Sequence, residues 1–416
     1  MNPPQFNYIH HIDKILREII FSFKTKFLSI MQNHKSLSLA FPCLILSCFI
    51  FSCKNNDPEV NTATEESTPL ALKVEVSTAS PQTIALGKML FWDPILSGNK
   101  DVACATCHHP ANGYADNLDL SIGLGGVGLG ANRHFLNPRT GVFVKRNSQT
   151  ILNTAFNGMD VNGNYDPVNA PMFWDSRVKS LENQSVEPIK TLEEMRGTKF
   201  TEITALDSVV ARLKNIPEYQ LLFKNAFGGT QSITTTNMSI AIATFERTLT
   251  ANNSPFDRYK RGEKTAMNAL EIQGMNAFQT VGCAGCHTGS MFSDYQLHVL
   301  SVPDNAKLAQ SDAGANGTYS FRTASLRNLK ATTPYMHSGV FRTLDDILRF
   351  YGNIAGGNSQ NPNVNIRQVD AKIRNVRIQN NQAALIAFIN TLSDDNFDKT
   401  VPTTVPSKLN PGGNIK

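Results

Sequence analysis

The stretch Cys104-Ala-Thr-Cys107-His108 decides the fold of this chain, and the same pattern returns as Cys283-Ala-Gly-Cys286-His287. In each copy two thiols stand one helical turn apart, so that each can form a thioether with one vinyl group of a single porphyrin. The histidine that follows can bind the iron. The pattern therefore predicts two covalently attached haem c groups, with His108 and His287 as iron ligands. The alternatives are a zinc site built from the two cysteine pairs or a redox dithiol, but neither explains a histidine after both pairs.

An internal repeat surrounds the two motifs. Gly87-Lys-Met-Leu-Phe91 precedes the first motif and Gly274-Met-Asn-Ala-Phe278 precedes the second, while Ala241-Ile-Ala-Thr-Phe245 and Ala384-Leu-Ile-Ala-Phe388 end the two halves. These runs have apolar residues at helical spacing, and each glycine offers a place where a second helix can cross closely. The repeat predicts an all-α protein of two cytochrome c-like domains, joined near Ala251, each with one covalently attached haem.

Composition divides the 416 residues further. We expect an upstream extension and lipoprotein signal at 1–53, a flexible tether at 54–78, an N-terminal domain at 79–251 and a C-terminal domain at 252–396. Residues 397–416 are rich in proline and glycine and predict a flexible tail. The glycine- and asparagine-rich segment 119–169 predicts long loops that wrap a site.

The N-terminal region indicates export. An apolar stretch at 37–52 follows Lys35 and ends at Cys53, after which the chain turns abruptly polar. This resembles a bacterial lipoprotein signal with Met31 as the true start and Cys53 as the lipidated residue, or Cys48 as the second choice. It predicts a protein anchored by lipid on the periplasmic side of a bacterial membrane. The alternative is an amphipathic anchor that is never cleaved.

The charge pattern gives no sign of nucleic-acid binding. The chain has 39 basic and 34 acidic residues, a net charge of +5, and its lysines and arginines are scattered without forming a patch. We therefore expect no nucleic-acid partner.

A longer series of motifs carries a family resemblance. It consists of Phe173-Trp174-Asp175-Ser176-Arg177, Leu181-Glu-Asn-Gln184, Glu194-Met195, the segment 147–153, Leu326-Arg-Asn328 and the segment 333–339. In this order the chain resembles the bacterial dihaem cytochrome c peroxidases and their MauG-type relatives over roughly residues 80 to 395.

The resemblance implies roles for individual residues. Glu194 matches the glutamate that moves a proton between the peroxide oxygens at the first haem, Gln184 matches its hydrogen-bonding neighbour, and Trp174 matches the tryptophan between the two haems. His337 matches a residue of the second haem pocket that would contact a propionate. The positions that hold a calcium ion at the domain boundary correspond to Asn147, Thr332 and Pro334.

Tyr351 is the predicted sixth ligand of the haem that His287 binds. Thr343 can cap a helix in which Leu344, Ile347, Leu348 and Tyr351 share one face, with Gly352 as its stop signal. The family resemblance places an axial ligand here, methionine in typical peroxidases and tyrosine in the MauG-type enzymes. The alternative is a core tyrosine bonded to a carbonyl group or a propionate.

One departure from the family pattern concerns the first haem. Typical dihaem peroxidases carry a blocking histidine after Ser-Ile-Gly, whereas Ser121-Ile122-Gly123 is followed here by Leu124, which cannot bind iron. The first haem is therefore expected to be open at rest, unless His134 replaces the missing ligand. His109 and His298 are expected to be structural.

Together these features predict an enzyme that reduces hydrogen peroxide to water. A small redox protein such as a cytochrome c would donate the electrons, which pass from the second haem to the first. Two alternatives remain: a MauG-type enzyme that oxidises a protein side chain, and a dihaem electron carrier without catalytic activity. The sequence identifies neither the donor nor the oligomeric state, and a homodimer stays open.

Overall fold

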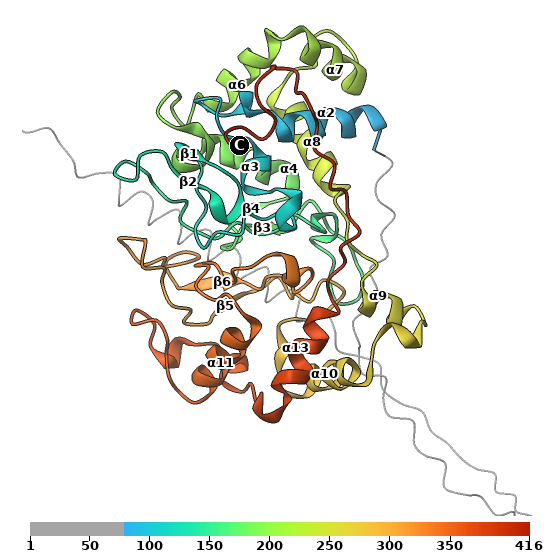
Figure 1. The fold of residues 1–416 in the computed structure, drawn as a ribbon, viewed down its shortest axis with the longest axis vertical. Coiled ribbons are helices and arrows are strands. Elements are labelled where there is room, and N and C mark those ends of the chain that lie inside the picture. Colours follow the sequence, from blue (N-terminus) through green and yellow to red (C-terminus); the bar gives the residue numbers. More distant parts are fainter. Residues whose placement is uncertain (1–78) are drawn as a thin grey trace, which may run out of the picture. The chain divides into compact units, whose positions relative to one another are not determined.

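The computed structural model describes residues 79–416, so the predicted signal, Cys53 and the tether at 54–78 lie outside the described residues. This part of the chain is mostly helical, with three two-stranded antiparallel sheets (Figure 1). Among the described residues, no helix is both long enough and apolar enough to cross a membrane.

The first half, residues 79–251, contains most of the helices. They are α2 (Pro81–Trp92), α3 (Cys104–Cys107), α4 (Leu181–Gln184), α5 (Glu187–Lys190), the π-helical turn η5 (Leu192–Arg196), α6 (Ala205–Lys214), α7 (Pro217–Phe227) and α8 (Thr235–Arg247). Its strands are β1 (Gly126–Val127), β2 (His134–Phe135), β3 (Pro171–Met172) and β4 (Val178–Lys179), and its 3-10 turns are η1 (Pro94–Leu96), η2 (Pro110–Asn112), η3 (Gly130–Asn132) and η4 (Thr154–Phe156).

The second half, residues 252–396, repeats the plan with fewer helices. They are α9 (Pro255–Lys260), α10 (Ala269–Thr280), α11 (Leu344–Ala355), α12 (Ala371–Arg374) and α13 (Gln382–Asn390). The strands β5 (Leu297–Val299) and β6 (Ser320–Arg322) pair with each other, and the 3-10 turns are η6 (Lys264–Ala266), η7 (Cys283–Gly285), η8 (Leu329–Ala331), η9 (Ile366–Gln368) and η10 (Gln379–Asn381).

The predicted helix crossings are present in both halves. A Cβ atom on Gly87 of α2 would lie 1.9 Å from the carbonyl oxygen of Ala241 on α8, and one on Gly274 of α10 would lie 1.8 Å from that of Ala384 on α13. The aromatic residues four positions after each glycine pack across the crossing, with ring centroids 5.2 Å apart for Phe91 and Phe245. The glycines are thus required where the two helices of each half touch.

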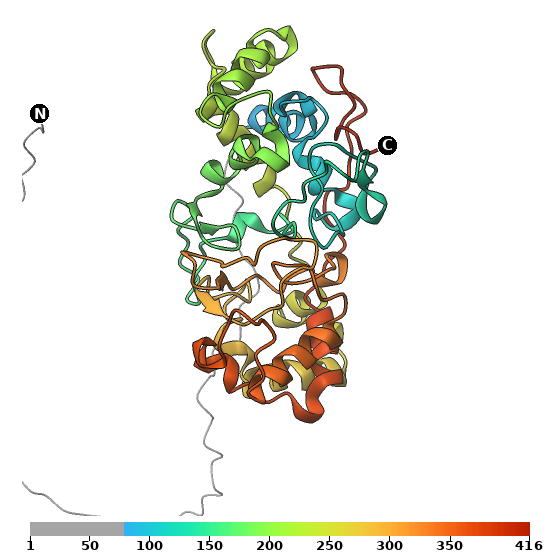
Figure 2. The same ribbon diagram turned by 90° about the vertical axis from the view of Figure 1, so that its left-hand side faces the viewer.

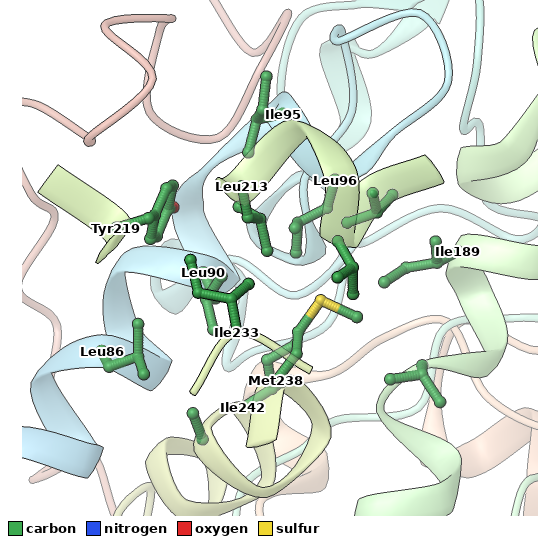
Figure 3. Close-up of a cluster of buried hydrophobic side chains, with 14 of the residues drawn as sticks. Leu86, Leu90, Ile95, Leu96, Ile189, Leu213, Tyr219, Ile233, Met238 and Ile242 are labelled. Carbon is green, nitrogen blue, oxygen red and sulfur yellow. The ribbon is translucent and has the colours of Figure 1, made fainter. Parts of the chain in front are cut away.

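A hydrophobic core fixes α2 and α8 in the first half. Leu86 and Leu90 of α2 pack with Met238 and Ile242 of α8, and α6 and α7 close the cluster from the other side (Figure 3). The halves meet near Ala251, whose backbone N–H donates to Asn153 Oδ1 at 2.7 Å and whose carbonyl accepts from Asn153 Nδ2 at 2.9 Å. Asn153, in the long loop of the first half, thereby holds the junction.

The helix that carries Tyr351 is longer than predicted. Thr343 caps α11 as expected, with a reciprocal hydrogen bond between its side chain and that of Asp346. The expected stop at Gly352 is wrong, because α11 continues to Ala355. Ile354 is fully buried, and its burial offsets the modest cost of an exposed glycine inside the helix.

The flexible tail predicted for residues 397–416 is also wrong. The segment runs back along the first half beside α2 and α3 (Figures 1 and 2). Tyr114 donates its hydroxyl to the carbonyl of Asp398 at 2.7 Å, and Thr106 donates to that of Gly412 at 2.7 Å. Val405 is buried at 1 % exposure. A few anchoring contacts order a segment whose composition alone predicts disorder.

Candidate active site

A cavity of about 580 Å³ is lined by residues of both halves. Both Cys-x-x-Cys-His motifs reach it, the first from α3 and the second from the turn η7. The long loops of the first half contribute residues 144–152, which agrees with the prediction that they wrap a site. Cavities of this size bind small molecules and cofactors in proteins.

The two motif histidines are oriented to bind iron. Nδ1 of His108 lies 3.1 Å from the carbonyl oxygen of Tyr114, and Nδ1 of His287 lies 2.9 Å from that of Phe292. A carbonyl oxygen can only accept, so each Nδ1 carries the proton and each Nε2 keeps a free lone pair. Burial lowers the pKa of both imidazoles, which favours the neutral form that a metal requires.

The four motif cysteines are free thiols in sheltered positions. Burial raises the pKa of the Cys107 and Cys283 thiols to about 12, so neither is a thiolate near neutral pH. A reactive dithiol needs the thiolate, whereas a thioether removes the ionisable proton altogether. Within residues 79–416 the four sulfurs do not converge on one point, which argues against a shared zinc site. The residues present fit two covalently held haems.

Glu194 extends into the same cavity as the first motif. It lies in η5, where the backbone N–H of Arg196 reaches the carbonyl of Thr191, five residues back, at 3.0 Å. Such π turns are rare and concentrate at functional sites. The Glu194 carboxylate has no hydrogen-bond partner within residues 79–416, so the group is free to face a ligand in the cavity.

Gly123 sets the position of this turn. A Cβ atom on Gly123 would lie 2.3 Å from the carbonyl oxygen of Glu193 and 2.5 Å from that of Glu194. Only glycine, which has no side chain, lets the loop pack directly against the backbone of Glu193 and Glu194. Burial, with a smaller contribution from the charge of Glu193, raises the pKa of Glu194 to about 7, against the opposing effect of Arg177. The carboxyl group can therefore gain and lose a proton near neutral pH.

Gln184 lines the cavity from the last position of α4. Ser180 caps this helix with its side-chain oxygen and directs the short α4 toward α8. The Gln184 amide has no hydrogen-bond partner within residues 79–416 and can donate to a molecule in the cavity. The structure thus brings Glu194 and Gln184 to the cavity of the first motif.

Trp174 connects the two halves. Its indole Nε1–H donates to the carbonyl of Asn147 at 3.0 Å, and its own carbonyl accepts from the backbone N–H of Arg322 at 2.6 Å. His337 lies beside it with ring centroids 6.3 Å apart, and stacks on Phe321 at 3.5 Å. Burial lowers the pKa of His337 to about 4. A neutral aromatic cluster therefore lines the cavity where the halves meet.

Arg322 is a site residue that the sequence prediction missed. Its side chain is buried and lines the cavity, and it donates to the carbonyl of Phe173 at 2.9 Å. It also donates to Gln149 Oε1 at 3.3 Å, and it forms no ion pair with a carboxylate among the residues that the structure describes. A buried guanidinium without a counter-ion is costly, so an anionic ligand such as a carboxylate is its natural partner. In the sequence nothing marks Arg322 as a site residue except its spacing, five residues before Arg327 of the motif Leu326-Arg-Asn328.

The three predicted calcium ligands lie along the same cavity. The side-chain Nδ2 of Asn147 donates to the carbonyl of Leu118 at 2.8 Å, which turns its Oδ1 the other way. Within residues 79–416 that Oδ1 and the carbonyl oxygens of Thr332 and Pro334 accept no hydrogen bond. Amide and carbonyl oxygens are the kind of ligand that calcium takes.

Tyr351 projects from α11 into the cavity near Cys283 and Cys286. Burial raises the pKa of its phenol, and the two neighbouring thiols raise it further. Its hydroxyl has no hydrogen-bond partner within residues 79–416. A core tyrosine bonded to a carbonyl group is therefore not what the structure shows.

Neither Leu124 nor His134 lines the cavity that contains the first motif. The Leu124 side chain packs into the first-half core beside Gly197 and does not line the cavity. His134 is exposed on β2, where its ring contacts the carbonyl of Asn132 at 2.9 Å, and it also does not line the cavity. The alternative that His134 replaces the missing ligand has no support in this arrangement.

The remaining two histidines have structural partners. His109 accepts the backbone N–H of Ala111 at 3.2 Å and caps η2. His298 lies between Asp294 at 3.0 Å and Asp370 at 2.6 Å, and the hydrogen bond that it donates to Asp294 contributes most to raising its pKa to about 10.

Comparisons with known proteins agree with this geometry. Residues 81–265 match the family described as di-haem cytochrome c peroxidase. The chain is 32 % identical to the methylamine utilization protein MauG of Methylorubrum extorquens over 78 % of this chain and 81 % of that protein. It is 34 % identical to the cytochrome c551 peroxidase of Pseudomonas aeruginosa over 68 % of this chain and 75 % of that protein.

The fold is also that of a solved relative. A MauG-like protein associated with microbial copper homeostasis superposes with a TM-score of 0.60 at 22 % identity, covering 80 % of this chain and 95 % of that chain. Relatives named as peroxidases and as MauG support an oxidoreductase. The chain belongs to the di-haem cytochrome c peroxidase and MauG family.

Proposed function

We propose that this protein is a di-haem c-type peroxidase that reduces hydrogen peroxide to water with electrons from an external redox protein. The observation that carries the proposal is the position of Glu194. An unpartnered carboxyl group with a pKa of about 7 shares one cavity with the first Cys-x-x-Cys-His motif. An electron carrier needs no acid–base group there, whereas a peroxidase does.

The residues that would hold the haems are Cys104, Cys107 and His108 in the first half and Cys283, Cys286 and His287 in the second. When bound, the haems would supply iron, which exchanges single electrons. Arg322 and His337 line the cavity and would bind carboxylate groups of the haems.

Proton transfer is the part that the protein performs. Glu194 in its carboxylate form accepts the proton of hydrogen peroxide and returns it to the oxygen that leaves as water. The Gln184 amide donates a hydrogen bond that orients the peroxide for this transfer. Trp174, bonded to both halves, offers an aromatic bridge for electrons that travel between the two motifs.

The proposal is tested by Glu194→Gln, which keeps the shape of the side chain but cannot accept a proton. Steady-state peroxide reduction should fall by about 100-fold or more, while both haems stay attached. Glu202→Gln, a change of an exposed glutamate, is the matched control and should keep full activity. If Glu194→Gln kept its turnover, Glu194 would have no role in the reaction, and the proposal would lose its main support.

A second activity is favoured by Leu124 and Tyr351. Without a blocking histidine near the first motif, and with an unpartnered phenol at the second, the site is similar to that of a MauG-type enzyme that oxidises a protein side chain. Rapid turnover with reduced cytochrome c supports the peroxidase. Slow turnover together with peroxide-dependent modification of a partner protein supports the MauG-type activity.

We infer the sixth ligand of the second haem to be Tyr351. Tyr351→Phe should change the absorption and electron paramagnetic resonance signals of that haem alone. Unchanged signals would exclude the ligand.

Calcium is proposed at Asn147, Thr332 and Pro334, where it would join the halves. A chelator should lower the thermal unfolding temperature of the wild type but not that of Asn147→Ala. An equal response in both proteins would exclude this site.

The localisation is a proposal as well, since Cys53 lies outside the described residues. Lipidation at Cys53 would tether the enzyme on the periplasmic side of the membrane. Cys53→Ala should release the protein into the soluble fraction, and a variant that stays membrane-bound would contradict the anchor.

A further inference from the structure

Glu246 is a buried carboxyl group for which the proposed mechanism has no role. It lies in the last turn of α8, is 5 % exposed and lines the cavity close to Cys104 and Leu181. Its Oε2 atom is buried and has no hydrogen-bond partner among the residues that the structure describes. Buried polar atoms of proteins are nearly always bonded, so this atom faces a partner supplied by the cavity, such as a water molecule.

The charged groups around Glu246 leave it without a counter-ion. They are Arg247 on α8, Glu182 on α4 and Cys104 on α3. Arg247 is engaged by Glu182 through both terminal nitrogens, one of them at 3.0 Å. The thiol of Cys104 loses its ionisable proton permanently when it forms a thioether. Burial raises the pKa of Glu246 to about 8, with Glu182 adding to the shift and Arg247 opposing it.

Glu246 is also next in the chain to one member of a partly exposed ion pair. The side chains of Glu182 and Arg247 are 33 % and 18 % exposed, whereas Glu246, the residue before Arg247, is buried. The short helix α4 carries Glu182 and, two residues on, Gln184 of the cavity. The partly exposed ion pair, Glu246 and the cavity residue Gln184 therefore all lie on two adjoining helices, α4 and α8.

The proposed reaction requires a path that carries protons from the surface to the cavity. Reduction of hydrogen peroxide breaks the O–O bond, and two electrons and two protons convert the two oxygen atoms into two water molecules. Glu194 can only move a proton that the peroxide already carries. The two additional protons must come from solvent through the protein.

We propose that Glu246 is a proton-relay residue that brings the two protons consumed per peroxide from the Glu182–Arg247 surface into the cavity. This inference rests on the proposed peroxidase function. Glu246 in its acid form donates to water in the cavity and is protonated again from the surface. Because the acid form is the donor, turnover should fall as the pH rises above about 8.

The test compares Glu246→Gln, Glu246→Asp and the control Glu263→Gln, an exposed glutamate in the second half. Steady-state turnover is measured from pH 6 to about 9.5, in H₂O and in D₂O. Glu246→Gln should lower kcat by about tenfold or more, with the peroxide KM unchanged. The fall in kcat above about pH 8 should disappear from its pH profile.

A single-turnover experiment with peroxide separates this inference from the proposed function. The first reaction with peroxide should stay fast in Glu246→Gln and be lost in Glu194→Gln. Glu246→Asp, which keeps an acid, should restore part of kcat and the fall at high pH. Equal losses in the Asp and Gln variants, or an unchanged pH profile in Glu246→Gln, would overturn the relay. A wild type without peroxide turnover would instead overturn the proposed function.

Discussion

At the scale of single residues, the informative feature is a set of charged side chains that lack an oppositely charged partner. Glu194, Glu246 and Arg322 all line one cavity, and the structure gives none of them a counter-ion within residues 79–416. Native proteins rarely leave such groups unbonded, because an unpaired buried charge costs several kcal/mol. Their gathering in one cavity is what the proposed proton transfers rest on.

The titration of Glu194 gives a prediction at this scale. The carboxylate form accepts the proton, so the rate of the reaction with peroxide should rise with pH and reach half its maximum near pH 7. Among the charges that raise this pKa, that of Glu193 contributes most. Glu193→Gln should therefore move the midpoint to lower pH, as stopped-flow rates measured from pH 5 to about 9 would show. A midpoint that stays in place in Glu193→Gln would contradict this account of the shift.

At the scale of elements, helix glycines have opposite roles in two places. Gly87 is required because α8 crosses α2 at that point, with the Ala241 carbonyl where a Cβ would stand. Gly352 of α11 has open space around its Cα and is exposed. The same substitution should thus have opposite signs at the two positions.

Gly87→Ala should destabilise the holoprotein by about 2 kcal/mol or more, since the two helices must move apart. Gly352→Ala should stabilise it by about 0.5–1 kcal/mol, because alanine is the better helix former and α11 continues through this residue. Denaturant unfolding of both variants measures the two changes in the free energy of unfolding. A stabilising Gly87→Ala would disprove the close crossing, and a destabilising Gly352→Ala would disprove the continuous helix.

At the scale of the whole molecule, the segment 397–416 ties the end of the chain to the first haem motif. Thr106, between the two motif cysteines, bonds both the backbone N–H of Ala103 and the carbonyl of Gly412. Gly412 in turn donates its N–H to the carbonyl of Trp92 at 2.7 Å. The C-terminal segment thereby supports the loop that would hold the first haem.

Removal of residues 397–416 should lower the stability of the first half. The hydrogen bonds that would be lost include those from Tyr114 to Asp398, from Thr106 to Gly412 and from Gly412 to Trp92. At about 1 kcal/mol each, these three amount to about 3 kcal/mol before the burial of Val405 is counted. Thermal unfolding followed by circular dichroism should show a lower midpoint, whereas removal of Lys416 alone should leave it unchanged. An unaltered midpoint after the full truncation would mean that the segment adds nothing to stability.

The sequence by itself determined the repeated haem motifs, the helix crossings and the family, because each depends on residues at short, regular spacings. Two thiols and a histidine within five positions, or a glycine followed by phenylalanine one turn on, constrain chemistry and packing locally. Glu194, Gln184 and Trp174 came from the resemblance to the family, and the structure brings them to one cavity.

Only the tertiary structure decided which polar groups lack partners and which segments are ordered. The neighbouring sequence does not distinguish Glu246 or Arg322 from surface charges, because burial depends on segments far away in the chain. The same holds for residues 397–416, whose proline- and glycine-rich composition predicts disorder until Thr106, Tyr114 and Trp92 provide hydrogen-bonding partners. Partners distant in sequence meet only in the folded chain, and their contacts outweigh local propensity.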